Sequence, residues 1–242
     1  MYSDVVELRD FYATGLGQVA RRMIRMRVRE LWPDLQGARL LGLGYAVPYL
    51  RPFVGEAERV IAMMPAMQGV LPWPRDGRNV AALVDEAEIP LQDASIDRVL
   101  MIHCLECSEQ VRPLLKEVWR VLDGGGRALI IVPNRAGIWA RLDWTPFGIG
   151  HPYSQAQLGR LLREEMFIPE TSTGALFVPP FRRRVVLGSS SFALEKLGVR
   201  WFTHFAGVIL IEAKKEIYLR PALRHKRRAS YLPVPQGAVS AL

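Results

Sequence analysis

Residues 38–44 read ARLLGLG, and this short stretch decides the fold class. Its apolar first part predicts a buried β-strand, and its two glycines predict a sharp turn at the carboxyl end of that strand. Further apolar strands are predicted downstream, at 58–63 (ERVIAM), 79–84, 96–102 (IDRVLMI) and 127–132 (RALIIV). The order of these segments indicates that several strands lie side by side in one sheet.

Helices are predicted between the strands. A short helix is expected at 47–53, because Pro48 is well tolerated in a first helical turn. A second is expected at 111–122, with its apolar residues on one side and a stop at Gly124–Gly126. Strands that alternate with helices in this way are typical of parallel βαβ units joined by right-handed crossovers, so the fold class is α/β.

The two ends of the chain depart from this alternation. Residues 3–31 have helical periodicity and predict one or two amphipathic helices, broken near 15–17 (GLG). Residues 154–157 (SQAQ) form a capping box, which predicts a helix from 154 to about 166. Two late strands are predicted at 175–178 and 207–213.

Composition is that of a globular protein. Half of the 242 residues are hydrophobic, and no apolar run reaches the roughly 20 residues of a membrane-spanning helix. The beginning of the chain lacks the basic-then-apolar pattern of a secretory signal, and the two cysteines, Cys104 and Cys107, provide no disulfide framework. These features predict a cytoplasmic location.

The net charge of +8 is concentrated in a few segments. Seven Lys or Arg and one Glu lie in 214–228, five Arg and one Glu lie in 19–31, and 182–184 is a run of three arginines. Such clusters are often solvated faces, but they also predict contact with an acidic partner, which is a protein, a nucleic acid or an anionic lipid. The sequence leaves both readings open.

The motifs downstream of the glycine turn follow a recognisable order. After the second strand come 85–91 (DEAEIPL), 95–103 (SIDRVLMIH), Leu105-Glu106 and 117–126 (EVWRVLDGGG). From residue 37 to 167 the chain resembles the type-11-like S-adenosylmethionine-dependent methyltransferases. The resemblance implies a Rossmann-like, doubly wound, seven-stranded and mostly parallel sheet whose last strand is antiparallel. It also implies S-adenosylmethionine as the cofactor.

The resemblance assigns roles to particular residues. The glycine turn would approach the methionine and ribose parts of the cofactor, and Asp85 or Glu86 would accept a hydrogen bond from the adenine amino group. Ile102 and His103 would face the sulfonium and the substrate. The predicted cofactor-binding residues are Gly42, Leu43, Gly44, Met64, Asp85, Glu86 and Ile102.

The cofactor motif departs from the family pattern at two places. Met64 stands at the tip of the second strand, where relatives carry an acid that binds both ribose hydroxyls, and a thioether accepts hydrogen bonds poorly. Tyr45 and Ala46 follow the turn where a further glycine is common. We therefore expect weak cofactor binding, Met64→Asp to tighten it, and Gly44→Val to abolish it with the fold largely intact.

The predicted catalytic residues are His103, His151 and Tyr153. The last two lie in the loop 139–154, which leaves the carboxyl end of the fifth strand and is predicted to cover the substrate. His103, Cys104 and Cys107 are soft ligands without a fourth partner, so no metal site is predicted.

Three functions remain open at this point. The first is methyl transfer to an unidentified small or medium acceptor. The second is a methyltransferase fold without catalytic activity, acting as a binding or scaffold partner through its basic ends. The third is a methyltransferase that docks on RNA or a lipid surface. The predicted organisation is a helical extension (1–36), a methyltransferase-like domain (37–216) and a basic tail (217–242).

Overall fold

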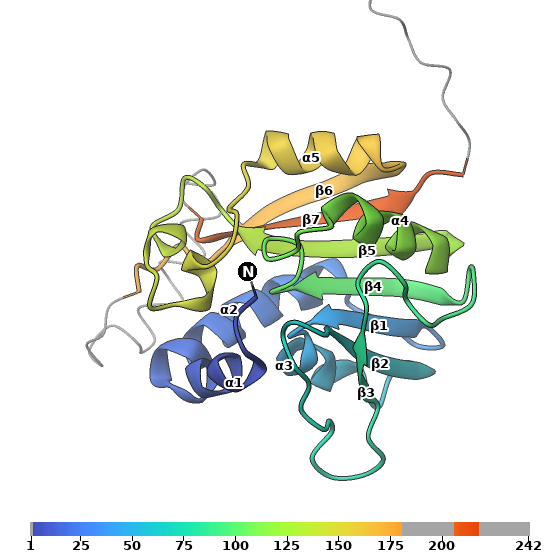
Figure 1. Ribbon diagram of the computed structural model, residues 1–242, viewed down its shortest axis with the longest axis horizontal. Helices are drawn as coiled ribbons and strands as arrows, with labels where there is room; N and C mark the ends of the chain where they lie inside the picture. Colours follow the sequence, from blue (N-terminus) through green and yellow to red (C-terminus); the bar gives the residue numbers. More distant parts are fainter. Residues whose placement is uncertain (1, 181–205, 218–242) are drawn as a thin grey trace, which may run out of the picture.

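The computed structural model describes residues 2–180 and 206–217 (Figure 1). The arginine run at 182–184 and nearly all of the predicted basic tail lie outside the described residues. None of the helices in the described ranges is long and apolar enough to cross a membrane.

The chain begins with two helices that share a single connecting residue. Helix α1 (Val5–Ala13) ends at Thr14, and helix α2 (Gly15–Leu31) begins directly after it. Thr14 has an extended backbone, and its side chain accepts a hydrogen bond from the Gly17 amide, so it ends one helix and caps the next. The predicted break is present, but it falls at Thr14 and not within 15–17.

Seven strands form one sheet in the order β3-β2-β1-β4-β5-β7-β6. Their bounds are β1 Arg39–Gly44, β2 Arg59–Pro65, β3 Ala81–Val84, β4 Ile96–Ile102, β5 Leu122–Pro133, β6 Phe167–Ala175 and β7 Val208–Lys215. Strands β1 to β5 run parallel to one another, and β7 is antiparallel to both β5 and β6. The predicted Rossmann-like sheet with an antiparallel last strand is confirmed.

Helices cover both faces of the sheet (Figure 1). The first face carries α1, α2, α3 (Val47–Leu50) and the 3-10 turn η1 (Arg51–Phe53), and their apolar residues share one core with alternate residues of β1, β2, β4, β5 and β7. The second face carries α4 (Val111–Val121) and α5 (Gln155–Glu164), which pack on the other residues of those strands. The predicted capping box of α5 is present at Ser154.

Two predicted elements are placed differently by the structure. The glycines at 124–126 belong to β5, because the chain becomes extended at Leu122 directly after α4. The strand predicted at 175–178 ends at Ala175, and its true extent is β6. Strand β6 is an edge strand with an exposed middle, so its sequence (FIPETSTGA) lacks the apolar pattern that marks the inner strands.

Candidate functional site

The candidate site lies at the carboxyl ends of the parallel strands. Chain order in the sheet reverses between β1 and β4, and ligands of open α/β sheets bind outside the strand ends at such a reversal. Gly44 pairs with Ile102 at this edge, and Leu43 pairs with Met63 on the other side. The predicted cofactor residues on β1, β2 and β4 are therefore neighbours.

The glycines of β1 permit close packing within the chain. Gly44 has a φ of +77°, and a Cβ added there would lie 2.3 Å from the carbonyl oxygen of Ile102 and 2.8 Å from the Cβ of Cys104. A Cβ at Gly42 would lie 2.5 Å from a methyl carbon of Leu50. The space beside both glycines is thus filled by neighbouring protein atoms.

The N-terminal segment lies along this edge of the sheet (Figure 1). The hydroxyl of Tyr2 donates a hydrogen bond to the carboxylate of Glu86. The Val5 amide donates to the backbone carbonyl of Gln68 at 2.8 Å, and Tyr12 of α1 reaches His103 at the tip of β4. Residues 2–12 therefore contact both ends of the predicted cofactor site.

A chain of hydroxyl groups ends on His103. The Tyr49 hydroxyl donates to the Tyr12 oxygen at 2.8 Å, and the Tyr12 hydroxyl lies 2.8 Å from His103 Nε2. Because the Tyr12 oxygen accepts from Tyr49, its own proton is directed at Nε2, which then acts as the acceptor. His103 Nδ1 faces a Glu106 oxygen at 3.6 Å.

The backbone of His103 is strained and its surroundings are buried. Its φ of +52° lies in the left-handed region, which non-glycine residues seldom adopt. His103 and Glu106 are 2% and 1% exposed. Outliers of this kind concentrate at functional sites, where the surrounding structure holds them in place.

Aromatic rings enclose the Tyr12 side chain and His103. The Tyr12 ring stacks on Tyr45 at 5.8 Å between centroids, and Phe147 lies 5.0 Å from the His103 ring. Phe147 also contacts Phe11 of α1 at 6.1 Å. It belongs to the 3-10 turn η3 (Pro146–Gly148) in the loop after β5, so this loop reaches the edge through an aromatic side chain, and its role in covering a substrate stays a prediction.

Burial controls protonation at the site. It raises the pKa of Tyr12 and of Tyr49 well above the usual range, so both phenols stay protonated at neutral pH. Burial also raises the pKa of the Cys104 thiol, and that of Cys107 to about 12, which removes thiolate character from both. Among the described residues, no three His, Cys, Asp or Glu side chains gather as metal ligands.

In this arrangement the N-terminal segment lies on the edge where S-adenosylmethionine is predicted to bind. Met64 is fully buried in the same core as Tyr12, Tyr45 and Tyr49, so the position that serves the ribose in relatives faces protein atoms. Its thioether would also be a poor acceptor for two hydroxyls. The residues as arranged do not fit the cofactor, and the N-terminal segment must move before they can.

The remaining predicted site residues occupy more open positions. Asp85 is exposed and accepts a hydrogen bond from the Ala87 amide, while Glu86 is half-buried under Tyr2. His151 is exposed, and its amide donates to the Glu106 carbonyl. Tyr153 packs against the core on the α4–α5 face, whereas Tyr12 belongs to the core of the opposite face. The roles of all four stay predictions.

Sequence reasoning missed the side chains that fill the edge. They are Tyr12, Tyr49, Gln68 and Phe147. For Tyr12 the sequence provides a partial indication, because its helical spacing predicted that it is buried. Periodicity does not reveal which other buried groups a side chain contacts. The Gln68 amide donates to the His103 carbonyl at 2.8 Å, a contact between residues far apart in sequence.

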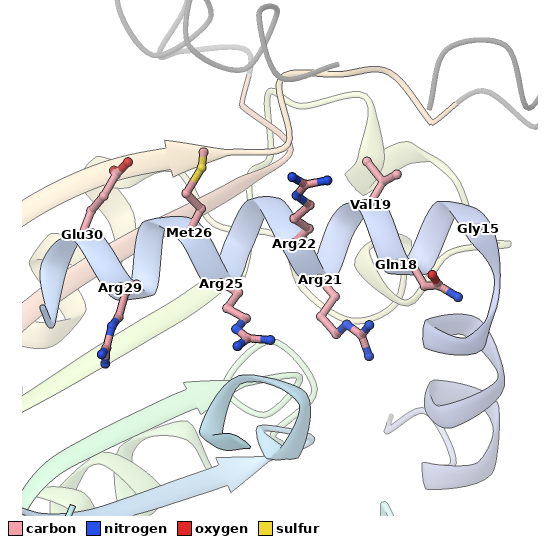
Figure 2. Close-up of a pocket in the computed structure, with 9 residues that line it drawn as sticks. All are labelled: Gly15, Gln18, Val19, Arg21, Arg22, Arg25, Met26, Arg29 and Glu30. Atoms are coloured by element: carbon pink, nitrogen blue, oxygen red, sulfur yellow. The ribbon is translucent and has the colours of Figure 1, made fainter. Parts of the chain in front are cut away.

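A separate hollow of about 770 Å³ lies along α2 (Figure 2). Arg21, Arg25 and Arg29 project from one side of the helix (Figure 2). Arg29 forms an ion pair with Glu56 at 2.7 Å and lies over the Phe53 ring. The predicted basic segment 19–31 is therefore a helix face that presents guanidinium groups.

Comparisons with known proteins agree with this fold. Residues 42–130 match the model of a methyltransferase domain family. A comparison with curated sequences found no significant match.

Three solved structures illustrate the structural similarity. A S-adenosylmethionine-dependent methyltransferase from Thermotoga maritima is 16% identical, with a TM-score of 0.61 over 88% of this chain and 96% of that one. The 1,6-didemethyltoxoflavin-N1-methyltransferase from Burkholderia thailandensis, with bound S-adenosylhomocysteine, is 17% identical, with a TM-score of 0.53 over 86% and 82%. The [4+2]-cyclase SpnF is 19% identical, with a TM-score of 0.56 over 83% of each chain. Residues 42–130 thus match a methyltransferase domain, and the described chain has the Rossmann-like fold of the S-adenosylmethionine-dependent methyltransferases to which it is similar.

Proposed function

We propose that this chain binds S-adenosylmethionine and methylates a small or medium acceptor when α1 leaves the carboxyl edge of the sheet. One observation carries the proposal. Tyr2 and Tyr12 form hydrogen bonds with Glu86 and His103, which are the residues expected at the adenine end and at the reacting end of the cofactor. The N-terminal segment thus lies along the predicted cofactor site, which belongs to the part of the chain that matches a methyltransferase domain.

In the open form, each group would have a simple task. Gly44 would keep the sharp turn at the end of β1 beside the cofactor, and Asp85 or Glu86 would accept from the adenine amino group. His103, held from behind by Glu106, would face the acceptor. Because the closed arrangement does not fit the cofactor, we assign no reaction step to these residues.

A second candidate is a binding protein that has lost methyl transfer. Met64 in place of an acid favours it, as does the filling of the edge by Tyr12, Tyr45 and Tyr49. The fold does not decide the matter, because the [4+2]-cyclase SpnF has it too.

Calorimetric titration with S-adenosylmethionine and S-adenosylhomocysteine separates the two candidates. For the wild-type chain we expect a Kd of about 10 μM or weaker, since the free energy of displacing α1 is subtracted from binding. Tyr12→Ala removes the ring that holds α1 on the edge, so it should tighten binding by about tenfold or more.

The control for this titration is Val6→Ala, because Val6 lies on the same helix with an exposed side chain. It should bind like the wild type. Nanomolar binding by the wild type would show that the edge is open in solution. If neither the wild type nor a folded Tyr12→Ala variant binds, the second candidate replaces the first.

We further propose that the basic face of α2 contacts an acidic partner. Arg21 and Arg25 line the hollow along this helix. The double variant Arg21→Ala, Arg25→Ala should elute from heparin at lower salt than the wild type, because fewer cationic groups pair with the anionic groups of heparin and fewer counterions are released. The charge-matched control is Arg160→Ala, Arg163→Ala on α5. Equal elution of the two double variants would refute a specific role for α2.

A further inference from the structure

The Tyr12 side chain occupies its site as a ligand would. A phenol ring lies against the Tyr45 ring, with its hydroxyl directed at His103 Nε2 at 2.8 Å. The site around it is formed by separate parts of the chain, namely α3 through Tyr49, the tip of β4 through His103, and the loop after β5 through Phe147. Tyr49 and His103 therefore contact the phenol itself, and Phe147 packs against the His103 ring beside it.

We infer that this site binds a compound with an aromatic hydroxyl, and that Tyr12 occupies the place of that compound in the closed form. The inference deepens the proposed function, since such a compound would be the acceptor. The compound's role as methyl acceptor rests on the proposed function. Its binding to the site does not, because that binding requires no cofactor.

The polar groups of the site show why the ligand carries a hydroxyl. His103 Nε2 is an acceptor, because Nδ1 faces the carboxylate of Glu106. A purely apolar ligand would leave this buried acceptor without a partner, which is unfavourable in a dry site. A phenol satisfies it and stacks on the surrounding rings.

The closed form leaves one polar atom of the site unsatisfied. Gln68 is 1% exposed, and its side-chain carbonyl oxygen has no hydrogen-bond partner among the described residues. Its amide nitrogen is fixed on the His103 carbonyl, so the oxygen lies beside the same site. Buried acceptors are seldom left unpaired in native proteins. The N-terminal segment is thus an incomplete occupant, and a ligand with a second donor would fit better.

The connection of α1 allows it to leave without unfolding the domain. Thr14 caps α2 through its own side chain and has an extended backbone, so a rotation at this residue need not break hydrogen bonds inside α2. Val5, Leu8 and Tyr12 are the buried residues of α1, and Phe11 packs beside them, so the departure of α1 exposes these apolar side chains and local opening carries that cost.

Hydrogen exchange of the full-length wild-type chain tests the inference with 4-methylphenol as the probe. Amides of α1 should exchange faster than those of β1 and β4, through local opening. At 5 mM probe, α1 exchange should rise about tenfold if the open site binds with a Kd near 0.5 mM, because the ligand multiplies the open population. Toluene has the same ring without the hydroxyl, and at the same concentration it should raise exchange by about twofold at most.

Two variants identify the hydroxyl and its acceptor. Tyr12→Phe removes the internal hydroxyl and keeps the ring, so α1 exchange should rise several-fold without any probe. Tyr49→Phe is the matched control, because its hydroxyl donates to Tyr12 and does not contact His103; it should have the smaller effect. His103→Asn tolerates the positive φ but ends short of the Nε2 position, so 4-methylphenol should lose its advantage over toluene.

The outcomes are distinct from those of the cofactor titration. The inference is wrong if the α1 amides exchange no faster than those of β1 and β4 and 4-methylphenol does not change their rate. Tyr12 is then an ordinary core residue. If toluene acts as strongly as 4-methylphenol, the site is a plain apolar cavity, which also overturns it. A response to 4-methylphenol in a chain that never binds S-adenosylmethionine would leave this site in place and remove methyl transfer.

Discussion

Met64→Asp should destabilise the fold by about 3 to 5 kcal/mol, which for a chain of this size lowers the midpoint of thermal unfolding by roughly 10 °C or more. Met64 is fully buried among apolar and aromatic side chains, so the new carboxylate would have neither water nor a cation beside it. From sequence alone, the same substitution is expected to restore cofactor affinity. The burial of Met64 reverses that expectation.

Urea and thermal unfolding of Met64→Asp measure the effect, with Met64→Leu as the control. Leucine is apolar and of similar volume, so it should cost less than about 1.5 kcal/mol. Burial raises the folded-state pKa of the introduced acid above its unfolded value. The destabilisation relative to the wild type should therefore shrink as pH falls through the folded-state pKa, and it should be smallest below about pH 3, where the group is protonated in both states. A stable Met64→Asp variant that binds S-adenosylmethionine more tightly would show that the edge is open in solution.

Gly44→Ala should destabilise the fold by about 2 to 4 kcal/mol. Two effects add at this position. Alanine adopts the φ of +77° only with strain, and its Cβ would lie 2.3 Å from the Ile102 carbonyl oxygen. The tips of β1 and β4 would have to separate. The sequence-based expectation that Gly44→Val leaves the fold largely intact is therefore replaced by one of marked destabilisation.

Two other glycines separate the strain from the clash. Gly37 has a φ of +70° but nothing within 4 Å of an added Cβ, so Gly37→Ala measures the strain alone, about 1 kcal/mol. Gly55 has neither feature, and Gly55→Ala should be nearly neutral. Unfolding midpoints should fall in the order Gly55→Ala, Gly37→Ala, Gly44→Ala. Equal midpoints for the last two would mean that the strand tips adjust freely.

The inner strands of the sheet can be predicted from the sequence, because strands buried on both faces appear as continuous apolar runs. Residues 96–102 coincide with β4, and the apolar runs near β1, β2 and β5 mark those strands to within a few residues. The capping box placed α5 through a purely local interaction. Strand β6 was misplaced because an edge strand with an exposed middle carries little apolar signal.

Only part of the candidate site can be predicted from the sequence. The glycine turn and the departure at Met64 follow from residue types in order along the chain. The contact of Tyr12 with His103 joins positions 91 residues apart, and it depends on how α1 lies across finished strand ends. Local periodicity predicts that Tyr12 is buried, but only the tertiary arrangement reveals that it fills the ligand edge.

The single-residue link at Thr14 determines how any free ligand competes for this edge. Because α1 is covalently tethered a few residues from its site, Tyr12 acts at a fixed effective concentration, on the order of millimolar or above for so short a link. Dilution of the protein does not weaken this competitor. Closure should therefore be the same at nanomolar and at millimolar protein, and only the concentration of the free ligand, or a partner that captures α1, can change how often the edge is open.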